Sequence, residues 1–307
     1  MSIDVIIPTY KPDKALFELV KRLNGQSLKP ENIIIMNTEE KYWDQLVSGT
    51  RFLEQNKNLK VYHVSKREFD HGGTRRLGVK KSQAEIFVMM TQDAMPANER
   101  LLEELTGNLQ GEIAASYARQ LPAKDCSVIE QYMRQFNYPE KSAVKSRKDL
   151  DRLGIKTYFC SNVCAAYRRE IYDALGGFVK HTIFNEDMLY AASACKAGYG
   201  ISYEAGAEVL HSHNYTNGQQ LHRNFDLGVS QAQHPEVFAG IASEAEGKKL
   251  VAGAAKWLWN NGHKSLIPHL IMQSGCKYLG YLLGKNYKKL PEKWVRKLSD
   301  NKSYWDR

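Results

Sequence analysis

The sequence predicts an α/β protein with a doubly wound, mostly parallel sheet and a C-terminal helical appendage. Short apolar runs, typical of buried parallel strands, alternate with segments of helical spacing through the first part of the chain. After about Leu221 the pattern becomes helical and shows no further strong strands. The 307 residues are enough for one large α/β domain and an appendage.

The elements follow in order from these patterns. Ile3–Ile7 is predicted as a first buried strand, closed by Pro8-Thr9-Tyr10. Lys14–Leu23 is predicted as a helix, because its leucines and valine share one face. Further strands are expected at residues 33–36, 60–64, 86–90, 113–117, 157–167 and 201–213, and further helices at residues 72–81, 99–109, 170–175 and 186–197. Residues 126–154 are expected to form a mobile helical excursion over the site, with a solvated loop as the alternative.

Composition limits the possible partners and compartments. The net charge is +9, from 43 Lys+Arg and 34 Asp+Glu, and suits nucleic acid, anionic lipid or a phosphorylated substrate. The five cysteines are scattered, as in proteins of a reducing compartment. No secretory signal and no apolar stretch of about 18 residues is evident, so we expect a cytoplasmic protein without a spanning helix.

The tetrapeptide Thr91-Gln92-Asp93-Ala94 follows the apolar run Ala84–Met90. The carboxyl ends of strands in an open α/β sheet are where ligands bind, so Asp93 is expected to face a crevice. Its carboxylate suits Mg²⁺ or Mn²⁺, which would bridge to phosphates. The alternative is an Asp that caps a helix or makes a turn.

Three further motifs carry possible chemistry. The pair Gly72-Gly73 before a helix could let backbone approach a phosphate, with Arg75 as an added donor, although paired glycines also simply make turns. Asn185-Glu186-Asp187 opens a helix and offers either a helix cap or a base for a sugar hydroxyl. His211 and His213 alternate on a predicted strand and could supply a metal ligand. A zinc site with Cys160 and Cys164 is a weaker alternative.

In this order, the motifs resemble the family 2 glycosyltransferases of the GT-A fold over about residues 1–235. The stretch from Val5 to Tyr10, the Gly72–Arg75 turn, Thr91–Ala94, Asn185–Asp187 and His211–His213 carry the resemblance. The Gln-Asp-Ala form of the metal motif and the late histidines look most like bacterial rhamnosyltransferases. The resemblance implies a catalytic domain at residues 1–235, with a nucleotide-binding half at about 1–95 and an acceptor half at about 96–235. Residues 236–307 then form a helical, basic, aromatic-rich C-terminal region.

The resemblance also implies roles for individual residues. Asp187 would be the general base of an inverting transfer, and Glu186 would orient the acceptor or the base. Asp93 would bind the divalent cation, with His211 or His213 as a further ligand. The residues implied in binding the nucleotide sugar are Pro8, Thr9, Tyr10, Asn37, Gly73, Arg75, Gln92 and Asp93. Many members carry an acid where Asn37 stands, so the base of the nucleotide is less defined by this motif.

The expected function is an inverting, metal-dependent transfer of L-rhamnose from dTDP-L-rhamnose to a growing, lipid-linked or cell-surface saccharide. One alternative is the same fold with a UDP-hexose donor. An alternative of another class is a non-catalytic sugar-nucleotide-binding or scaffolding subunit.

The C-terminal residues 256–307 combine eleven Lys and Arg with three acids and interleaved aromatic residues. Such a basic amphipathic region suits an anionic membrane surface and predicts a peripheral location at the inner face of the cell membrane. The alternative is helices that pack on the catalytic domain or on a second copy in a homo-oligomer. Nucleic acid is not expected, because no recognition motif accompanies the charge.

Overall fold

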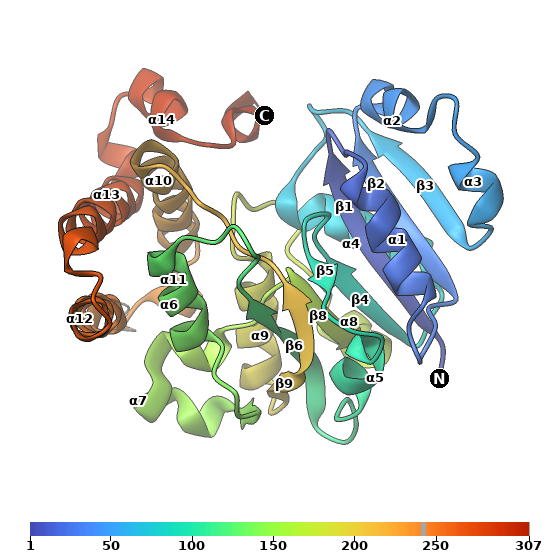
Figure 1. The fold of residues 1–307 in the computed structure, drawn as a ribbon, viewed down its shortest axis with the longest axis horizontal. Coiled ribbons are helices and arrows are strands. Elements are labelled where there is room, and N and C mark those ends of the chain that lie inside the picture. Colours follow the sequence, from blue (N-terminus) through green and yellow to red (C-terminus); the bar gives the residue numbers. More distant parts are fainter. Residues whose placement is uncertain (241–243, 307) are drawn as a thin grey trace.

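The computed structural model describes residues 1–240 and 244–306. Within these residues, nine strands form one sheet in the order β3-β2-β1-β4-β8-β6-β9-β5, and β7 pairs with β9 (Figure 1). The strands are β1 (Ile3–Tyr10), β2 (Asn32–Thr38), β3 (Leu59–Val64), β4 (Ile86–Met90), β5 (Met95–Pro96), β6 (Ile113–Leu121), β7 (Ala143–Lys145), β8 (Cys164–Arg168) and β9 (Gly200–Leu210).

Helices flank this sheet and form the C-terminal region. Those between strands are α1 (Ala15–Asn24), α2 (Glu40–Val47), α3 (Phe52–Gln55), α4 (His71–Lys81), α5 (Leu101–Thr106), α6 (Val128–Asn137), α7 (Leu150–Leu153), α8 (Arg169–Ala174) and α9 (Glu186–Lys196). Those after the last strand are α10 (Asn217–Gln233), α11 (Pro235–Phe238), α12 (Glu244–Asn260), α13 (Ile267–Lys285) and α14 (Glu292–Leu298). Short 3-10 helices are η1 (Arg147–Asp149), η2 (Gly154–Tyr158), η3 (Lys264–Leu266), η4 (Tyr287–Lys289) and η5 (Lys302–Asp306).

The first four strands confirm the predicted parallel arrangement. β1 lies between β2 and β4 and is parallel to both, and β3 continues the parallel pairing on the far side of β2. The chain therefore changes direction across the sheet between β1 and β4, which is the switch point at which open α/β sheets bind ligands. Tyr10, at the end of β1, and Asp93, in the turn after β4, flank this point.

The second half of the sheet is mixed. β8 is antiparallel to both β4 and β6, whereas β6 and β9 are parallel to each other. β6 and β9 therefore run in the direction of β4, and the carboxyl ends of all three strands meet at one edge. This shared edge brings residues from distant parts of the sequence together.

Two predicted strands are shorter than expected. The strand expected at residues 157–167 begins only at Cys164, because the N–H of Asn162 is donated to the Asp187 carboxylate instead of to a neighbouring strand. The strand expected at residues 201–213 ends at Leu210, so His211 and His213 lie in the segment that follows it.

The C-terminal helices pack on the catalytic part of the chain. α13 lies along α10, and the contact is so close that a Cβ added at Gly284 would lie 2.1 Å from the carbonyl oxygen of Phe225. Leu258 and Leu270 of α12 and α13 form a buried cluster with Ile129 of α6. Residues 126–137 are thus held against the C-terminal region, which fits the packing alternative for these helices.

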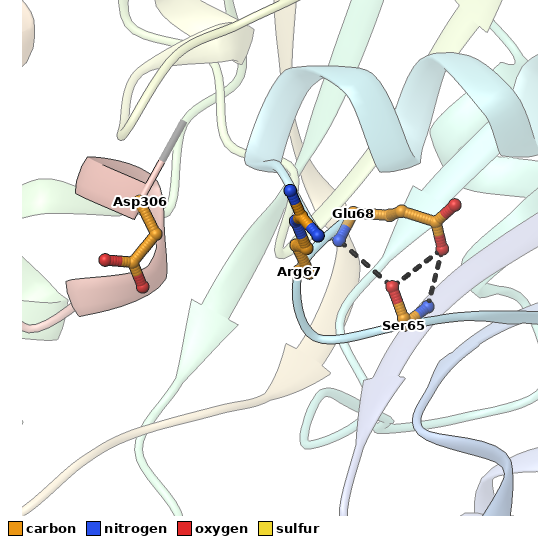
Figure 2. Close-up of a pocket in the computed structure, with 4 residues that line it drawn as sticks. All are labelled: Ser65, Arg67, Glu68 and Asp306. Atoms are coloured by element: carbon orange, nitrogen blue, oxygen red, sulfur yellow. Dashed lines mark hydrogen bonds between the residues drawn. The ribbon is translucent and has the colours of Figure 1, made fainter.

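The C-terminal segment then returns toward the first half of the sheet (Figure 1). Asp306 faces the loop of residues 65–68 across an open cavity (Figure 2). Among the described helices, none combines the length and apolar character that a bilayer crossing requires.

Candidate active site

A cavity of about 610 Å³ opens at the switch point of the sheet. Its walls come from the ends of β1 and β4, the start of α9, and the segments after β9 and before β8. Asp93 and Asp187, which are far apart in the sequence, both line it. Of the predicted site residues, those that line this cavity are Pro8, Thr9, Tyr10, Arg75, Gln92, Asp93, Glu186, Asp187, His211 and His213.

Asp93, His211 and His213 form a cluster that could hold a metal ion. Their ligand atoms all lie within 4.8 Å of one another. Nε2 of His213 lies 3.2 Å from Oδ2 of Asp93, and Nε2 of His211 lies 3.5 Å from Oδ1. The convergence follows from the parallel direction of β4 and β9, since both strands end at the same edge of the sheet. Two imidazoles and one carboxylate are ligands that Mn²⁺ and related ions accept.

The hydrogen bonds behind His211 fix its tautomer. Arg134 donates to Oε1 of Gln120, and arginine has no acceptor, so this atom of the amide must be the oxygen. His211 Nδ1 lies 3.0 Å from the same oxygen and must therefore carry the proton. Nε2 of a neutral His211 is then free to bind a metal through its lone pair, whereas in the protonated form the same atom donates to Asp93. Such a partner behind a ligand histidine is the usual way in which proteins orient it.

The electrostatics of this cluster favour an ionised carboxylate. Burial by itself would raise the pKa of Asp93, but the hydrogen bonds of His211 and His213 outweigh it and hold this pKa well below its usual range. Burial lowers the pKa of His211, which favours its neutral, metal-ligating form.

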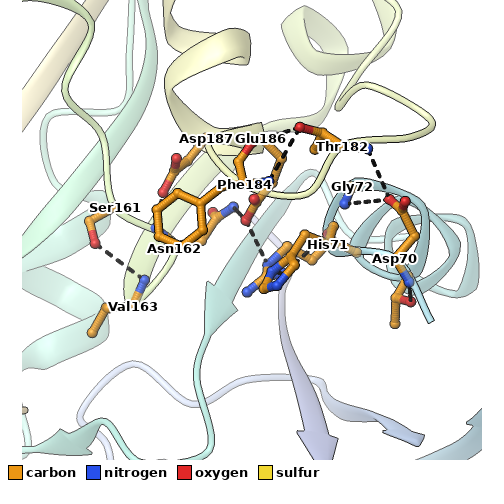
Figure 3. Close-up of polar contacts among 12 residues, drawn as sticks. Asp70, His71, Gly72, Ser161, Asn162, Val163, Thr182, Phe184, Glu186 and Asp187 are labelled. Carbon is orange, nitrogen blue, oxygen red and sulfur yellow. Dashed lines mark hydrogen bonds and ion pairs between the residues drawn. The ribbon is translucent and has the colours of Figure 1, made fainter. Parts of the chain in front are cut away.

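Glu186 and Asp187 share one hydrogen-bonding partner (Figure 3). The Asn162 main-chain N–H donates to Oδ2 of Asp187 at 3.0 Å, and its side-chain amide donates to Oε1 of Glu186 at 3.0 Å. Tyr167 fixes that amide by donating to its oxygen at 2.7 Å. Arg75 makes a buried ion pair with Glu186 at 3.1 Å.

These surroundings shift the pKa values of Glu186 and Asp187 in opposite directions. Burial, followed by the charge of Glu186, raises the pKa of Asp187 to about 7. Burial would also raise the pKa of Glu186, but the charge of Arg75 outweighs it and the pKa is lowered. Glu186 is therefore a fixed anion, whereas Asp187 can take up and release a proton near neutral pH. Two carboxyl groups with separated pKa values are typical of catalytic sites.

The start of α9 carries backbone strain that places these carboxylates. Asn185 has a φ of 64°, an unusual value for a residue other than glycine. Its amide donates to Oγ of Ser230 on α10 at 3.2 Å, and this hydroxyl donates to the carbonyl of Phe184 at 2.7 Å. α10 thus holds the turn that directs the first acidic residues of α9 toward the cavity.

The glycine pair has a packing role in the structure, and its contact with the nucleotide stays a prediction. Oδ1 of Asp70 already accepts from the N–H groups of Gly72 at 2.9 Å and Gly73 at 2.8 Å, so the start of α4 has its own cap. A Cβ at Gly72 would lie 2.2 Å from the carbonyl oxygen of Val179 (Figure 3 shows Asp70 and Gly72). The glycines therefore serve the close packing of α4 on residues 179–182. Arg75, predicted at the nucleotide, lines the cavity and makes an ion pair with Glu186.

Asn37, a predicted nucleotide contact, is fully buried and is not among the residues that line the cavity. Its amide oxygen accepts from Thr9 at 3.1 Å, and its amide nitrogen donates to the carbonyl of Glu39 at 3.1 Å. Its polar groups are thus used within the sheet, and its contact with the nucleotide stays a prediction. Gln92 lines the cavity, but its amide exchanges two hydrogen bonds with the backbone of Tyr10, at 2.9 Å and 3.2 Å.

Three residues of the site are missing from the sequence-based prediction. Asn162 was placed inside a strand, and Gln120 and Arg134 had no motif of their own. Polar residues at the end of β6, beside an edge already predicted to bind metal, are the one signal that could have indicated Gln120. Cys160 and Cys164, the alternative zinc ligands, are buried and are not part of the metal cluster.

Comparison with known proteins identifies the class. The profile of the Glycosyl transferase family 2 family matches residues 4–176, which is more than half of the chain. The chain belongs to this family and is a glycosyltransferase. It is 38% identical to the O-antigen chain rhamnosyltransferase RfbN of Salmonella typhimurium strain LT2, over 100% of this chain and 96% of that protein. It is also 38% identical to the O-antigen chain rhamnosyltransferase WbaN of Salmonella anatum, over 99% of this chain and 96% of that protein.

Solved structures support the fold. The mannosyltransferase PcManGT of Pyrobaculum calidifontis, solved with GDP-Man and Mn²⁺, superposes with a TM-score of 0.53 at 16% identity, over 98% of this chain and 84% of that one. Residues 1–349 of S. aureus TarS, solved with UDP-GlcNAc, give a TM-score of 0.50 at 14% identity, over 94% and 92%. At this identity the likeness concerns the GT-A fold alone, which is the predicted fold class.

Proposed function

We propose that the protein transfers L-rhamnose from dTDP-L-rhamnose to a hydroxyl of a growing O-antigen-like polysaccharide, with inversion at the anomeric carbon. The observation that carries the proposal is that Asp93 and Asp187 line one cavity, the first beside two histidines and the second with a pKa near 7. The full-length similarity to two rhamnosyltransferases supports the choice of sugar. As a glycosyltransferase, the chain is not the non-catalytic binding subunit considered from its sequence.

The proton transfer is assigned to Asp187. An acceptor hydroxyl beside its carboxylate loses its proton to Asp187 while its oxygen attacks the anomeric carbon. The bond to the departing nucleotide diphosphate breaks on the opposite side, so no covalent enzyme intermediate is needed and the configuration inverts. The Asn162 N–H holds the Asp187 carboxylate in position, while burial and the charge of Glu186 raise its affinity for the proton.

Asp93, His211 and His213 fit a divalent cation of the Mg²⁺ or Mn²⁺ type. The fit rests on one ionised carboxylate and two imidazoles within 4.8 Å, one of which has its tautomer fixed by Gln120. When bound, the cation would offset the negative charge that develops on the nucleotide diphosphate. The two nitrogens make Mn²⁺ a better match than Mg²⁺, which prefers oxygen ligands.

A donor screen tests the proposal. The full-length chain is incubated with Mn²⁺, a lipid-linked saccharide acceptor and each of dTDP-rhamnose, UDP-galactose, UDP-glucose and GDP-mannose, and the product mass is read. A gain of one deoxyhexose with dTDP-rhamnose alone supports the proposal. A hexose gain from a UDP-sugar would favour the alternative donor class. The anomeric configuration of the transferred rhamnose in the product, read by NMR from its one-bond C1–H1 coupling, reports inversion.

We also propose that α13 contributes to peripheral membrane binding. Ile271, Met272 and Leu279 are exposed on this helix by 61%, 60% and 50%, and they border a mainly apolar groove. Trp259 and Trp294 are similarly exposed on neighbouring helices, and the ammonium group of Lys264 lies over the ring of Trp259. Such a surface matches an anionic bilayer interface, where it would lie beside a lipid-linked acceptor. Association of two copies through α13 is the alternative occupant of the same surface.

A further inference from the structure

A second cavity, of about 790 Å³, lies between the first half of the sheet and the C-terminal segment. We name it the tail cavity. One wall comes from Tyr10, Thr38, Lys66 and Phe69, at the ends of β1 and β2 and the loop before α4. The opposite wall comes from residues 297–303. Part of the C-terminal region, which we predicted to bind a membrane surface, thus also borders the first half of the sheet.

The tail cavity continues the candidate active site. Tyr10, Phe69 and His71 line both cavities. A ligand that reaches Asp93 from the side of β1 and β2 therefore passes these three residues and enters the tail cavity. A sugar nucleotide with its diphosphate at Asp93 can therefore extend past these residues into the tail cavity.

Cations from both walls face the tail cavity. Lys66 contributes one ammonium group, and Lys297 and Lys302 contribute two more from the C-terminal segment. None of these three ammonium groups forms an ion pair within residues 1–240 and 244–306, and Asp300 is the only carboxylate among the lining residues. Unpaired lysines that meet across a gap are suited to an anionic ligand. Tyr10 and Phe69 add aromatic surface that a nucleobase can contact.

Polar groups on both walls are left without partners. Oγ1 of Thr38, which is 2% exposed, and Nδ2 of Asn301 have no hydrogen-bond partner within the described part of the chain. Buried polar groups are rarely unpaired unless a ligand or solvent completes them. One such group on each wall indicates that a polar ligand belongs between the walls.

The C-terminal wall is held in place by specific contacts. Oδ2 of Asp226 on α10 accepts from the N–H groups of Asp300 at 3.0 Å and Asn301 at 3.1 Å. Nδ1 of His222 lies 2.7 Å from the carbonyl oxygen of Leu298. The ring of Tyr304 stacks on the ring of His181, with the two ring centroids 4.3 Å apart. Residues 297–304 are therefore fixed to the catalytic domain by specific hydrogen bonds and ring stacking.

The resemblance places the nucleoside of the donor at the ends of β1 and β2, beside the tail cavity, and we propose that residues 297–303 form the second wall of this subsite and contact the nucleoside. The base contacts Tyr10 and Phe69, and the phosphates point toward Asp93. Lys297 and Lys302, which line the tail cavity and not the cavity of Asp93, add positive charge beside the nucleoside end of this anionic ligand. The proposal rests on the proposed function, because it assumes a nucleoside diphosphate donor, and it adds a binding role for the C-terminal segment.

Calorimetric titration of the full-length chain with dTDP in the presence of Mn²⁺ tests the proposal. The double variant Lys297→Ala, Lys302→Ala removes the two cations from the cavity wall. The matched control, Lys289→Ala with Lys293→Ala, removes two exposed lysines of the same region that do not line the cavity. We expect the first variant to bind dTDP about tenfold more weakly and the control to bind within about twofold of wild type. Thermal unfolding should be unchanged in both.

Photo-crosslinking gives a readout that is independent of affinity. With 4-thio-dTDP we expect adducts in residues 297–303 or 66–69, located by peptide mapping. Equal dTDP affinity in both double variants, or adducts confined to other parts of the chain, would overturn the proposal while leaving the glycosyltransfer reaction intact. A wild-type chain that binds neither dTDP nor UDP would overturn the proposed donor itself and this inference with it.

Discussion

Replacing Asp187 by Asn tests the catalytic assignment most directly. The substitution keeps the size of the side chain but removes a base whose pKa lies near 7. General bases contribute about 10²- to 10⁴-fold to rate, so we expect a loss of kcat in this range. Affinity for dTDP should stay near that of wild type, because the proposed mechanism has Asp187 act on the acceptor and not on the nucleotide.

The wild-type pH profile provides a second measure of the same group. With a pKa of about 7, the ionised fraction of Asp187 increases from about one tenth at pH 6 to about nine tenths at pH 8, so kcat should rise about tenfold over this range. Initial rates in buffers of constant ionic strength would show the rise. Asp173→Asn, at an exposed carboxylate of α8, is the control and should keep the wild-type profile.

The same pKa makes stability change in the opposite direction. The pKa of Asp187 is raised in the folded state from 3.8 to about 7, so its contribution is fully present below pH 3.8 and is lost as the pH rises through 7. The loss is at most about 4 kcal/mol. Turnover near the wild-type level in Asp187→Asn, or a flat rate profile from pH 5 to 8, would remove Asp187 from the role of base.

Three other predictions concern the metal, the packing and the membrane. Gln120→Leu should weaken Mn²⁺ binding by about 10- to 100-fold, as measured by electron paramagnetic resonance, because His211 loses the acceptor that fixes its tautomer; unchanged affinity would contradict this. Gly284→Ala should lower the free energy of unfolding in urea by about 2 kcal/mol or more, since its Cβ would overlap α10, whereas Gly275→Ala on the same helix has free space and should be neutral or slightly stabilising. Ile271→Glu with Met272→Glu should abolish flotation with anionic liposomes; retained flotation would exclude α13 as the binding surface.

The parallel half of the sheet was predictable because its signal is local. The strand expected at Ile86–Met90 has the observed bounds, since a fully apolar run followed by Asp93, Ala94 and Pro96 leaves few other arrangements. The members of the candidate metal cluster, Asp93, His211 and His213, were also predicted from local motifs. They come together because β9 runs parallel to β4, and no local sequence pattern predicts that arrangement.

The errors arise where one residue serves two distant elements. Asn162 is in a sequence that reads as a strand, yet its N–H is taken by Asp187, which is 25 residues away. Gly72 and Gly73 look like a phosphate-binding turn, but what they approach is the backbone of residues 179–182. Asn37 lies near the end of β2, and its amide is used by the Thr9 hydroxyl and by the main-chain carbonyl of Glu39. Such tertiary partners are invisible to periodicity and spacing.

The position of the C-terminal end has a practical consequence for protein production. Asp306 faces residues 65–68, beside the cavity to which we assign the nucleoside. An affinity tag or a fluorescent protein fused after the last residue would begin at the rim of that cavity and compete with the donor for space. The amino terminus lies at the far end of the molecule (Figure 1), so a fusion there leaves the rim open.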